Sequence, residues 1–142
     1  MWFWYALGAS ALWGIGYVIN QILMRSLTSI EILLVESFMI LVIFIPWLFF
    51  NGTFKPMLLK LTDIKTFALV ICGSIIYISA AILILTSIGA SNATLAAIIE
   101  ASYPIFTMIF AYLLIGEIQF SFYSIVGCVF IITGLVIVHY GH

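Results

Sequence analysis

Glu100 is the residue whose type and position point most directly to chemistry. It lies near the middle of an apolar stretch that covers about residues 90–115, four residues before Pro104. An ionisable group at this depth of a bilayer is costly, so such residues usually face a cavity. We therefore predict that Glu100 handles a proton or a substrate inside a membrane transporter. The alternative is a protonated acid that holds helices together through a hydrogen bond.

The residues around Glu100 predict a cavity wall on one helix. Pro104 lacks an N–H group, so it leaves a carbonyl near Glu100 without its helical partner and kinks the helix. Polar backbone at membrane depth is tolerated where it lines a cavity, and a kink that serves packing alone is the alternative. Small, acidic and hydroxyl-bearing residues share this face by helical spacing: Ala93, Ala96, Glu100, Tyr103 and Thr107.

A second acid and several aromatic residues are weaker candidates for the same site. Glu36 falls inside another apolar run, where it could bind substrate, share a proton with Glu100 or reach the membrane interface. Rings and an amide on one side of the most N-terminal run suit an amphipathic or cationic ligand. Core packing is the alternative for these residues, which are Trp13, Tyr17, Asn20 and, in a later run, Tyr77.

The other residues predict neither catalysis nor metal binding. The sequence contains no glycine-rich phosphate loop, no nucleophile motif and no cluster of Asp, His and Cys. Cys72 and Cys128 both lie inside apolar segments, so we expect no disulfide framework. We therefore expect no enzyme activity, no cofactor and no metal, and the absence of a basic run predicts no nucleic-acid partner.

The composition predicts an integral membrane protein with an all-α fold. The chain is 66% hydrophobic and 6% charged, whereas about a quarter of a typical soluble chain is charged. A helix needs roughly 20 apolar residues to cross the bilayer, and lipid offers no hydrogen-bond partner to an open strand edge. Polar joints divide the single domain, residues 1–142, into five such helices at about residues 2–24, 29–50, 64–88, 91–115 and 121–140.

The joints between these runs carry recognisable helix signals. Thr28 and Glu31 have the spacing of a capping box, and Ser91 or Asn92 would cap the fourth helix. Gly89 and Gly116 would end the third and fourth helices.

Residues 55–61 could form a short turn at the membrane interface. In the fifth helix, Gly127 and Gly134 form a small-residue stripe that predicts helix packing or a dimer contact.

The basic residues predict how the chain lies in the membrane. Lys55, Lys60 and Lys65 fall on the same side as the N-terminus, and Arg25 falls on the opposite side. Because cytoplasmic loops are richer in lysine and arginine, we expect a cytoplasmic N-terminus. The difference is only two charges, so insertion in both orientations stays open.

Three stretches of the sequence resemble the drug/metabolite transporter superfamily, specifically its EamA-type unit of five helices. The resemblance covers essentially the whole chain and is specific for the family, but not for a substrate. It is carried by Ala11-Leu12-Trp13-Gly14 in the first helix, by Ala93-Thr94-Leu95-Ala96-Ala97, Tyr103-Pro104-Ile105-Phe106 and Leu114-Ile115-Gly116-Glu117 in the fourth, and by Ser124-Ile125-Val126-Gly127 with Gly134 in the fifth.

The resemblance implies that this unit is one half of an inverted-repeat transporter. Similar proteins have ten helices, built as two five-helix repeats of opposite orientation with the substrate at the midplane. It therefore implies an antiparallel homodimer, or a heterodimer with an inverted homologue, in a bacterial or archaeal cytoplasmic membrane. Relatives often have a basic residue near the position of Glu36, so the acid here favours cationic or zwitterionic cargo, or coupling to protons.

We accordingly predict a secondary transporter that exports a small organic solute, such as an amine, an amino acid or a related metabolite. Glu100 would be the principal acid and Glu36 the secondary one. The alternatives are a membrane subunit that positions a partner protein without transporting anything, and a component of a lipid-linked sugar flippase.

Overall fold

The computed structural model describes residues 1–116, 118 and 121–141 of the chain. The chain divides into two compact units, one formed by Met1–Tyr17 with Ser91–His142 and the other by Val18–Ala90. The prediction of a single domain over residues 1–142 therefore stays a prediction.

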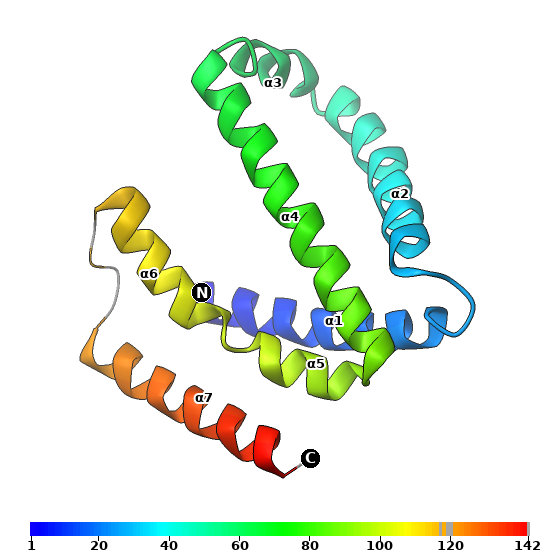
Figure 1. The fold of residues 1–142 in the computed structure, drawn as a ribbon. Helices are drawn as coiled ribbons and strands as arrows, with labels where there is room; N and C mark the ends of the chain where they lie inside the picture. Colours follow the sequence, from blue (N-terminus) through cyan, green and yellow to red (C-terminus); the bar gives the residue numbers. More distant parts are fainter. Residues whose placement is uncertain (117, 119–120, 142) are drawn as a thin grey trace. The chain divides into compact units, whose positions relative to one another are not determined.

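Among the described residues, five helical segments are long and apolar enough to cross a membrane, which confirms the all-α class with five spans (Figure 1). The described residues form no strand. At 1.5 Å per residue, even the shortest span, with 19 residues, extends about 28 Å, close to the thickness of the hydrocarbon core. The spans are α1 (Trp2–Leu23), α2 (Ser29–Phe50), α4 (Ile64–Ala90), α5 with α6 (Ala93–Ile115) and α7 (Phe122–Tyr140).

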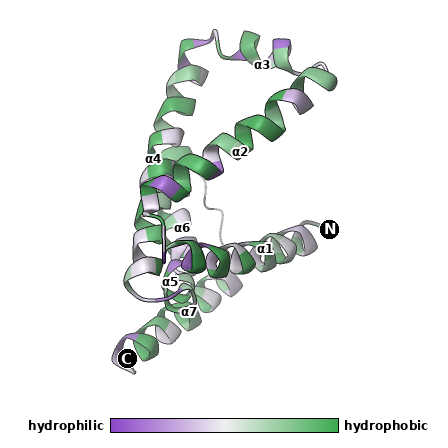
Figure 2. Cartoon of the chain, turned by 90° about the vertical axis from the view of Figure 1, so that its right-hand side faces the viewer, coloured by the Kyte–Doolittle hydropathy of each residue, from purple (hydrophilic) through white to green (hydrophobic). Residues whose placement is uncertain are grey.

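In the unit Val18–Ala90, α2 and α4 form a helical hairpin around a small apolar core. The side chains of Ile32, Leu85 and Ile88 are buried, and the hydroxyl oxygens of Ser29 and Thr86 lie 3.2 Å apart. The connection contains a short helix, α3 (Phe54–Lys60), where we predicted an interfacial turn. Figure 2 shows mostly hydrophobic residues along α2 and α4 and hydrophilic ones around α3.

Gly89 does not end α4, so that prediction was wrong. The helix continues through Gly89 to Ala90. An added Cβ at this glycine would lie 2.5 Å from the Cε methyl at the flexible end of the Met24 side chain, so Gly89 leaves room for that methyl group.

The other helix ends follow the capping residues. Thr28 and Glu31 form the predicted capping box of α2. Asn92, one of the two predicted caps, caps α5 (Ala93–Glu100), because its Oδ1 accepts the N–H of Leu95 at 2.9 Å. Gly116 ends α6 (Tyr103–Ile115) with φ of 77°, a left-handed conformation that favours glycine.

Asp63 is bonded to the first turn of α4. Its Oδ2 accepts hydrogen bonds from the backbone N–H of Thr66 at 2.9 Å and from the Thr66 hydroxyl at 2.7 Å. These bonds favour the ionised form and lower the pKa of the Asp63 carboxyl below its usual 3.8. Their contribution to stability is therefore fully present above pH 3.8 and is lost as the pH falls through the lowered pKa.

The fourth span is broken into two helices in the other unit. After α5 ends at Glu100, residues Ala101 and Ser102 leave the helix, and α6 starts with Pro104 in its first turn (Figure 1). Proline is well suited to the start of a helix, because its missing N–H has no helical partner there. We predicted a kink at Pro104, and the structure interrupts the helix at Ala101 and Ser102, whose backbone stays in the right-handed helical region.

Replacing Asn92 with Ala should lower the free energy of unfolding by about 1 kcal/mol, the typical cost of losing an N-cap. The change removes the acceptor for the Leu95 N–H. Thermal unfolding in detergent would measure it. Asn92→Ser should keep most of the stability, and Thr94→Ala, at an exposed neighbouring position, should have little effect. Equal melting temperatures for Asn92→Ala and Thr94→Ala would contradict the capping role.

Candidate functional site

A hydrogen bond between Tyr17 and Glu100 forms the centre of the candidate site. The Tyr17 hydroxyl on α1 donates to Oε2 of Glu100 at the end of α5. Both residues belong to the unit Met1–Tyr17 with Ser91–His142. Tyr17 is 8% exposed, and Glu100 is half-buried. The sequence indicated each residue as a candidate but gave no sign that they form a pair.

Neighbouring residues hold this pair in place. The rings of Trp13 and Tyr17, one turn apart on α1, have centroids 5.9 Å apart at an angle of 53°. On α5, Ala93 and Ala96 are 3% and 1% exposed, and such small residues let helix backbones approach closely.

The helix break adds a second polar feature beside Glu100. Because Pro104 has no N–H, the carbonyl of Glu100 cannot make its usual bond to the residue four positions later. A carboxyl group, a phenol and an incompletely bonded backbone carbonyl therefore occur within one region of a membrane span. In lipid these groups require partners or a water-filled cavity.

The Tyr17–Glu100 pair can accommodate two protonation states of the acid. An ionised carboxylate only accepts hydrogen bonds, whereas a protonated one also donates. A tyrosine hydroxyl can donate or accept, so it remains a partner for either form of Glu100. The geometry is thus suited to a group that alternates between holding a proton and holding a cation.

Tyr103 and Thr107 line a separate cavity between α6 and α7. The break at Ala101 and Ser102 divides the face that we expected to be continuous, and the Thr107 hydroxyl bonds the Tyr103 carbonyl at 3.0 Å. This α6–α7 cavity has a volume of about 420 Å³. Its lining consists of Tyr103, Pro104, Thr107 and Met108 from α6 and Ser124, Gly127, Cys128 and Ile131 from α7.

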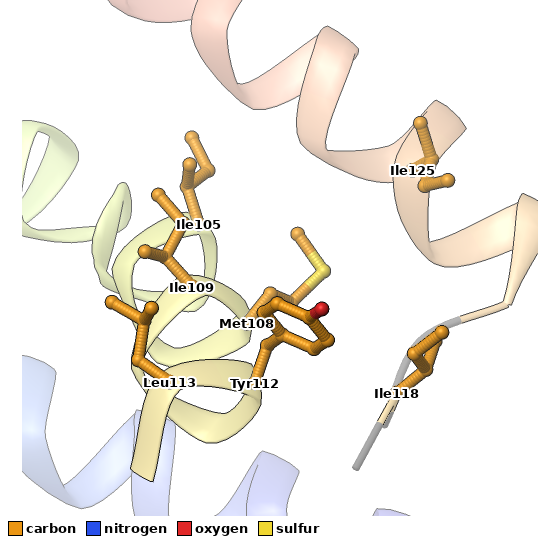
Figure 3. A pocket seen from close by; sticks show the side chains of 7 residues that line it. All are labelled: Ile105, Met108, Ile109, Tyr112, Leu113, Ile118 and Ile125. Carbon is orange, nitrogen blue, oxygen red and sulfur yellow. The ribbon is translucent and has the colours of Figure 1, made fainter. Parts of the chain in front are cut away.

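A second cavity on the same two helices is almost wholly apolar and has a volume of about 580 Å³. Figure 3 shows the α6 side chains on one side and Ile118 and Ile125 on the other, with the Tyr112 hydroxyl as the one polar tip. Sequence reasoning missed this cavity, because aliphatic residues in an apolar span carry no signal of a hollow. Its lining residues are Ile105, Met108, Ile109, Tyr112, Leu113, Ile118 and Ile125.

Three predicted site residues belong to the unit Val18–Ala90. Glu36 on α2 is exposed, Tyr77 on α4 is 57% exposed, and Asn20 on α1 is half-buried. Their predicted roles beside Glu100 remain predictions.

The two glycines of the predicted stripe on α7 make no close contact inside the described part of the chain. An added Cβ at Gly127 or Gly134 would meet no atom within 4 Å. Packing of this stripe against a second chain remains a prediction. Among the described residues, no group of three or more His, Cys, Asp and Glu side chains could hold a metal ion.

The sequence was compared with known proteins. Residues 1–140 match the model of the EamA-like transporter family. No curated protein and no solved structure matches the chain. The family match covers the stretches that carry the resemblance, although Glu117 in one of them lies outside the described residues.

Proposed function

The chain belongs to the EamA-like transporter family, and from this membership we propose that it exports a small organic amine, amino acid or related metabolite in exchange for protons. Members of this family are multi-pass membrane transporters, which agrees with the five spans. The observation that carries the finer proposal is the Tyr17–Glu100 hydrogen bond beside the broken fourth span.

The proposed mechanism is competition between a proton and a cationic group for one carboxyl. When Glu100 is ionised, it binds the ammonium group of the cargo, while the Tyr17 hydroxyl holds the second position on the carboxylate. The nearby ring of Trp13 offers a face to the same cation. Protonation of Glu100 removes the charge and releases the cargo, so protons entering the cell drive amines out.

The absence of a basic residue from the middle of every span supports cationic or zwitterionic cargo. All four Lys and Arg residues of the sequence lie between spans or in the first turn of a span, at Arg25, Lys55, Lys60 and Lys65. An anionic cargo would therefore find no counter-charge at mid-span. Glu36 would serve as a second acid for a dicationic cargo or a second proton.

We also propose that the unit works with a second unit of opposite orientation, either a second copy or an inverted homologue. An odd number of spans inverts a following copy, and inverted repeats place the substrate between them at the midplane. The lysine residues around α3 favour a cytoplasmic N-terminus in the cytoplasmic membrane.

A transport screen tests the proposed function. Purified protein in proteoliposomes with an acidic interior should accumulate some amines or amino acids above the level in protein-free liposomes, and collapse of the pH gradient should stop this. Nucleosides serve as uncharged comparison solutes. If no solute accumulates, but the protein flips a fluorescent lipid-linked sugar, the flippase alternative replaces the proposal. If neither occurs, the alternative of a partner subunit is favoured.

A labelling experiment tests the antiparallel arrangement. In a background without Cys72 and Cys128, a cysteine added at the C-terminus should react with a membrane-impermeant thiol reagent in about half of the molecules in intact cells if copies insert both ways. Complete labelling would call for an inverted partner protein. Complete labelling together with transport by the purified chain in one uniform orientation would contradict the antiparallel model.

A further inference from the structure

The α6–α7 cavity combines polar tips with apolar walls, and we propose that it binds the uncharged body of the transported solute. Its volume of about 420 Å³ falls within the range of ~300–1,000 Å³ that is typical of small-molecule sites. The inference rests on the proposed function, because the amino group of the same solute would bind at Glu100. It adds α7 to the site, because the residues that we predicted to bind substrate or protons all lie in the first four spans.

The hydroxyl of Tyr103 points to a ligand with an oxygen acceptor. Tyr103 lies near the middle of the span Ala93–Ile115 and makes no hydrogen bond to any of the residues that the structure describes. Tyr103 is 65% exposed in this chain, and inside a bilayer the lipid chains offer its hydroxyl no partner. The other two hydroxyls of the lining already bond within the chain, Thr107 to the Tyr103 carbonyl and Ser124 to Ser121. A carbonyl or hydroxyl oxygen of the solute would satisfy Tyr103.

The remaining walls fit an uncharged aromatic or aliphatic group. The lining contains no Asp, Glu, Lys, Arg or His, and two of its members carry sulfur, Met108 and Cys128. Thioether groups adapt to irregular shapes and make favourable contacts with aromatic rings. The cargo class is therefore an amine that carries an oxygen acceptor and an uncharged aromatic or aliphatic body.

Gly127 keeps the cavity open. It lines the cavity, and a Cβ added to it would meet no atom within 4 Å, so any side chain there would extend into empty space. Gly134 has equally free surroundings seven residues later on α7, but it does not line the cavity. Substitutions at the two glycines therefore distinguish two roles. A role in ligand binding would involve Gly127 alone, whereas a role in association between chains would involve both Gly127 and Gly134.

The thiol of Cys128 allows the cavity to be probed directly. Cys128 is 9% exposed and lines the cavity, so in a Cys72→Ser background it is the one thiol of the chain and is reached through the cavity. Methyl methanethiosulfonate, a small uncharged reagent, should modify it in proteoliposomes. Gly127→Leu should slow this reaction about tenfold or more, because the new side chain fills the space beside the thiol, whereas Gly134→Leu should leave the rate unchanged.

A matched pair of probes tests whether the body of the solute binds in the cavity, because a bound ligand should protect Cys128 from modification. Phenylalaninamide and glycinamide carry the same ammonium and amide groups and differ in the benzyl body. Millimolar phenylalaninamide should slow the modification severalfold, glycinamide should not, and Tyr103→Phe should weaken the protection. Gly127→Ala, which adds one methyl group, replaces Gly127→Leu if the larger side chain prevents folding, and should slow the reaction less.

Each outcome decides the proposal separately from transport. Equal reaction rates in Gly127→Leu and Gly134→Leu would show that the cavity does not lead to Cys128 and would overturn the inference. If phenylalaninamide and glycinamide slowed the modification of Cys128 equally, the proposed binding of the uncharged body in the cavity would be overturned. Protection by phenylalaninamide without proton-coupled transport would support the pocket while contradicting the proposed function. Proton-coupled transport of phenylalaninamide without protection of Cys128 would support the proposed function while contradicting the pocket.

Discussion

Glu100→Gln should abolish proton-coupled transport while the protein still folds. The amide resembles the protonated carboxyl in shape and can still bond the Tyr17 hydroxyl, so the contact between α1 and α5 persists. It can neither release a proton nor bind an ammonium group as an anion. Losing a hydrogen bond to a charged group costs roughly 1.5–3 kcal/mol, so cargo binding should weaken roughly 10- to 100-fold.

Uptake of the identified cargo by proteoliposomes, with and without a pH gradient, would measure this effect. Glu31→Gln is the matched control, because Glu31 lies at the N-terminus of α2 and glutamine keeps its capping-box bond to Thr28. Gradient-driven transport at the normal rate by Glu100→Gln would remove the coupling claim. Loss of folding in this variant would favour the role of Glu100 as a packing residue.

Tyr17→Phe tests the partner of Glu100 without removing the acid. The change deletes the hydroxyl and keeps the ring against Trp13, so the fold and the aromatic contact should survive. Transport should remain but become slower, because the ionised carboxylate loses one of its hydrogen-bond donors. Tyr123→Phe, at an 84% exposed position on α7, should leave the transport rate unchanged. Equal transport rates for the wild type and Tyr17→Phe would show that the hydroxyl has no role at Glu100.

Pro104→Ala should join α5 and α6 more closely and greatly reduce transport. Alanine restores the N–H that the Glu100 carbonyl lacks, and it removes a residue that costs about 3 kcal/mol inside a helix. The resulting shift in Glu100 and Tyr103 should lower the transport rate roughly tenfold or more, since misplacing functional groups by about 1 Å has effects of this size or larger. Helix content by circular dichroism should rise slightly.

Pro46 provides the matched control for Pro104→Ala. Pro46 lies inside α2, where the helix continues across it from Ser29 to Phe50. Pro46→Ala should therefore raise the thermal stability without a large loss of transport. Equal transport rates in the two proline variants would show that the break before Pro104 has no functional role.

The spans were predictable because each depends on local sequence. Apolar runs of about 20 residues require helices in lipid, and the Thr28–Glu31 capping box and Gly116 fixed helix ends in the expected places. Gly89 misled the prediction, because a glycine signals both helix ends and close packing, and only the neighbouring Met24 distinguishes them. The break before Pro104 was predicted as a kink, since sequence does not show how far a proline interrupts the helix.

The pairs and cavities of the site were not predictable, because they join distant parts of the chain. Tyr17 and Glu100 are 83 positions apart, and no local pattern links them. Helical spacing placed Tyr103 and Thr107 on one face but did not show that Ser124 and Gly127 of α7 lie opposite. The surroundings of Gly127 were not predictable for the same reason. From the sequence, its small size suggested helix packing, whereas in the structure the space beside it is open.

Proton movement upon addition of cargo tests the central claim most directly. Proteoliposomes that contain the purified chain and a pH-sensitive dye, with an imposed pH gradient, are given a cargo from the transport screen. Wild-type protein should dissipate the gradient when cargo is added, and Glu100→Gln should leave it unchanged although the variant is folded and inserted. Equal proton movement with both proteins, or cargo transport by the wild type without any proton movement, would contradict the role of Glu100 as the residue that exchanges a proton for cargo.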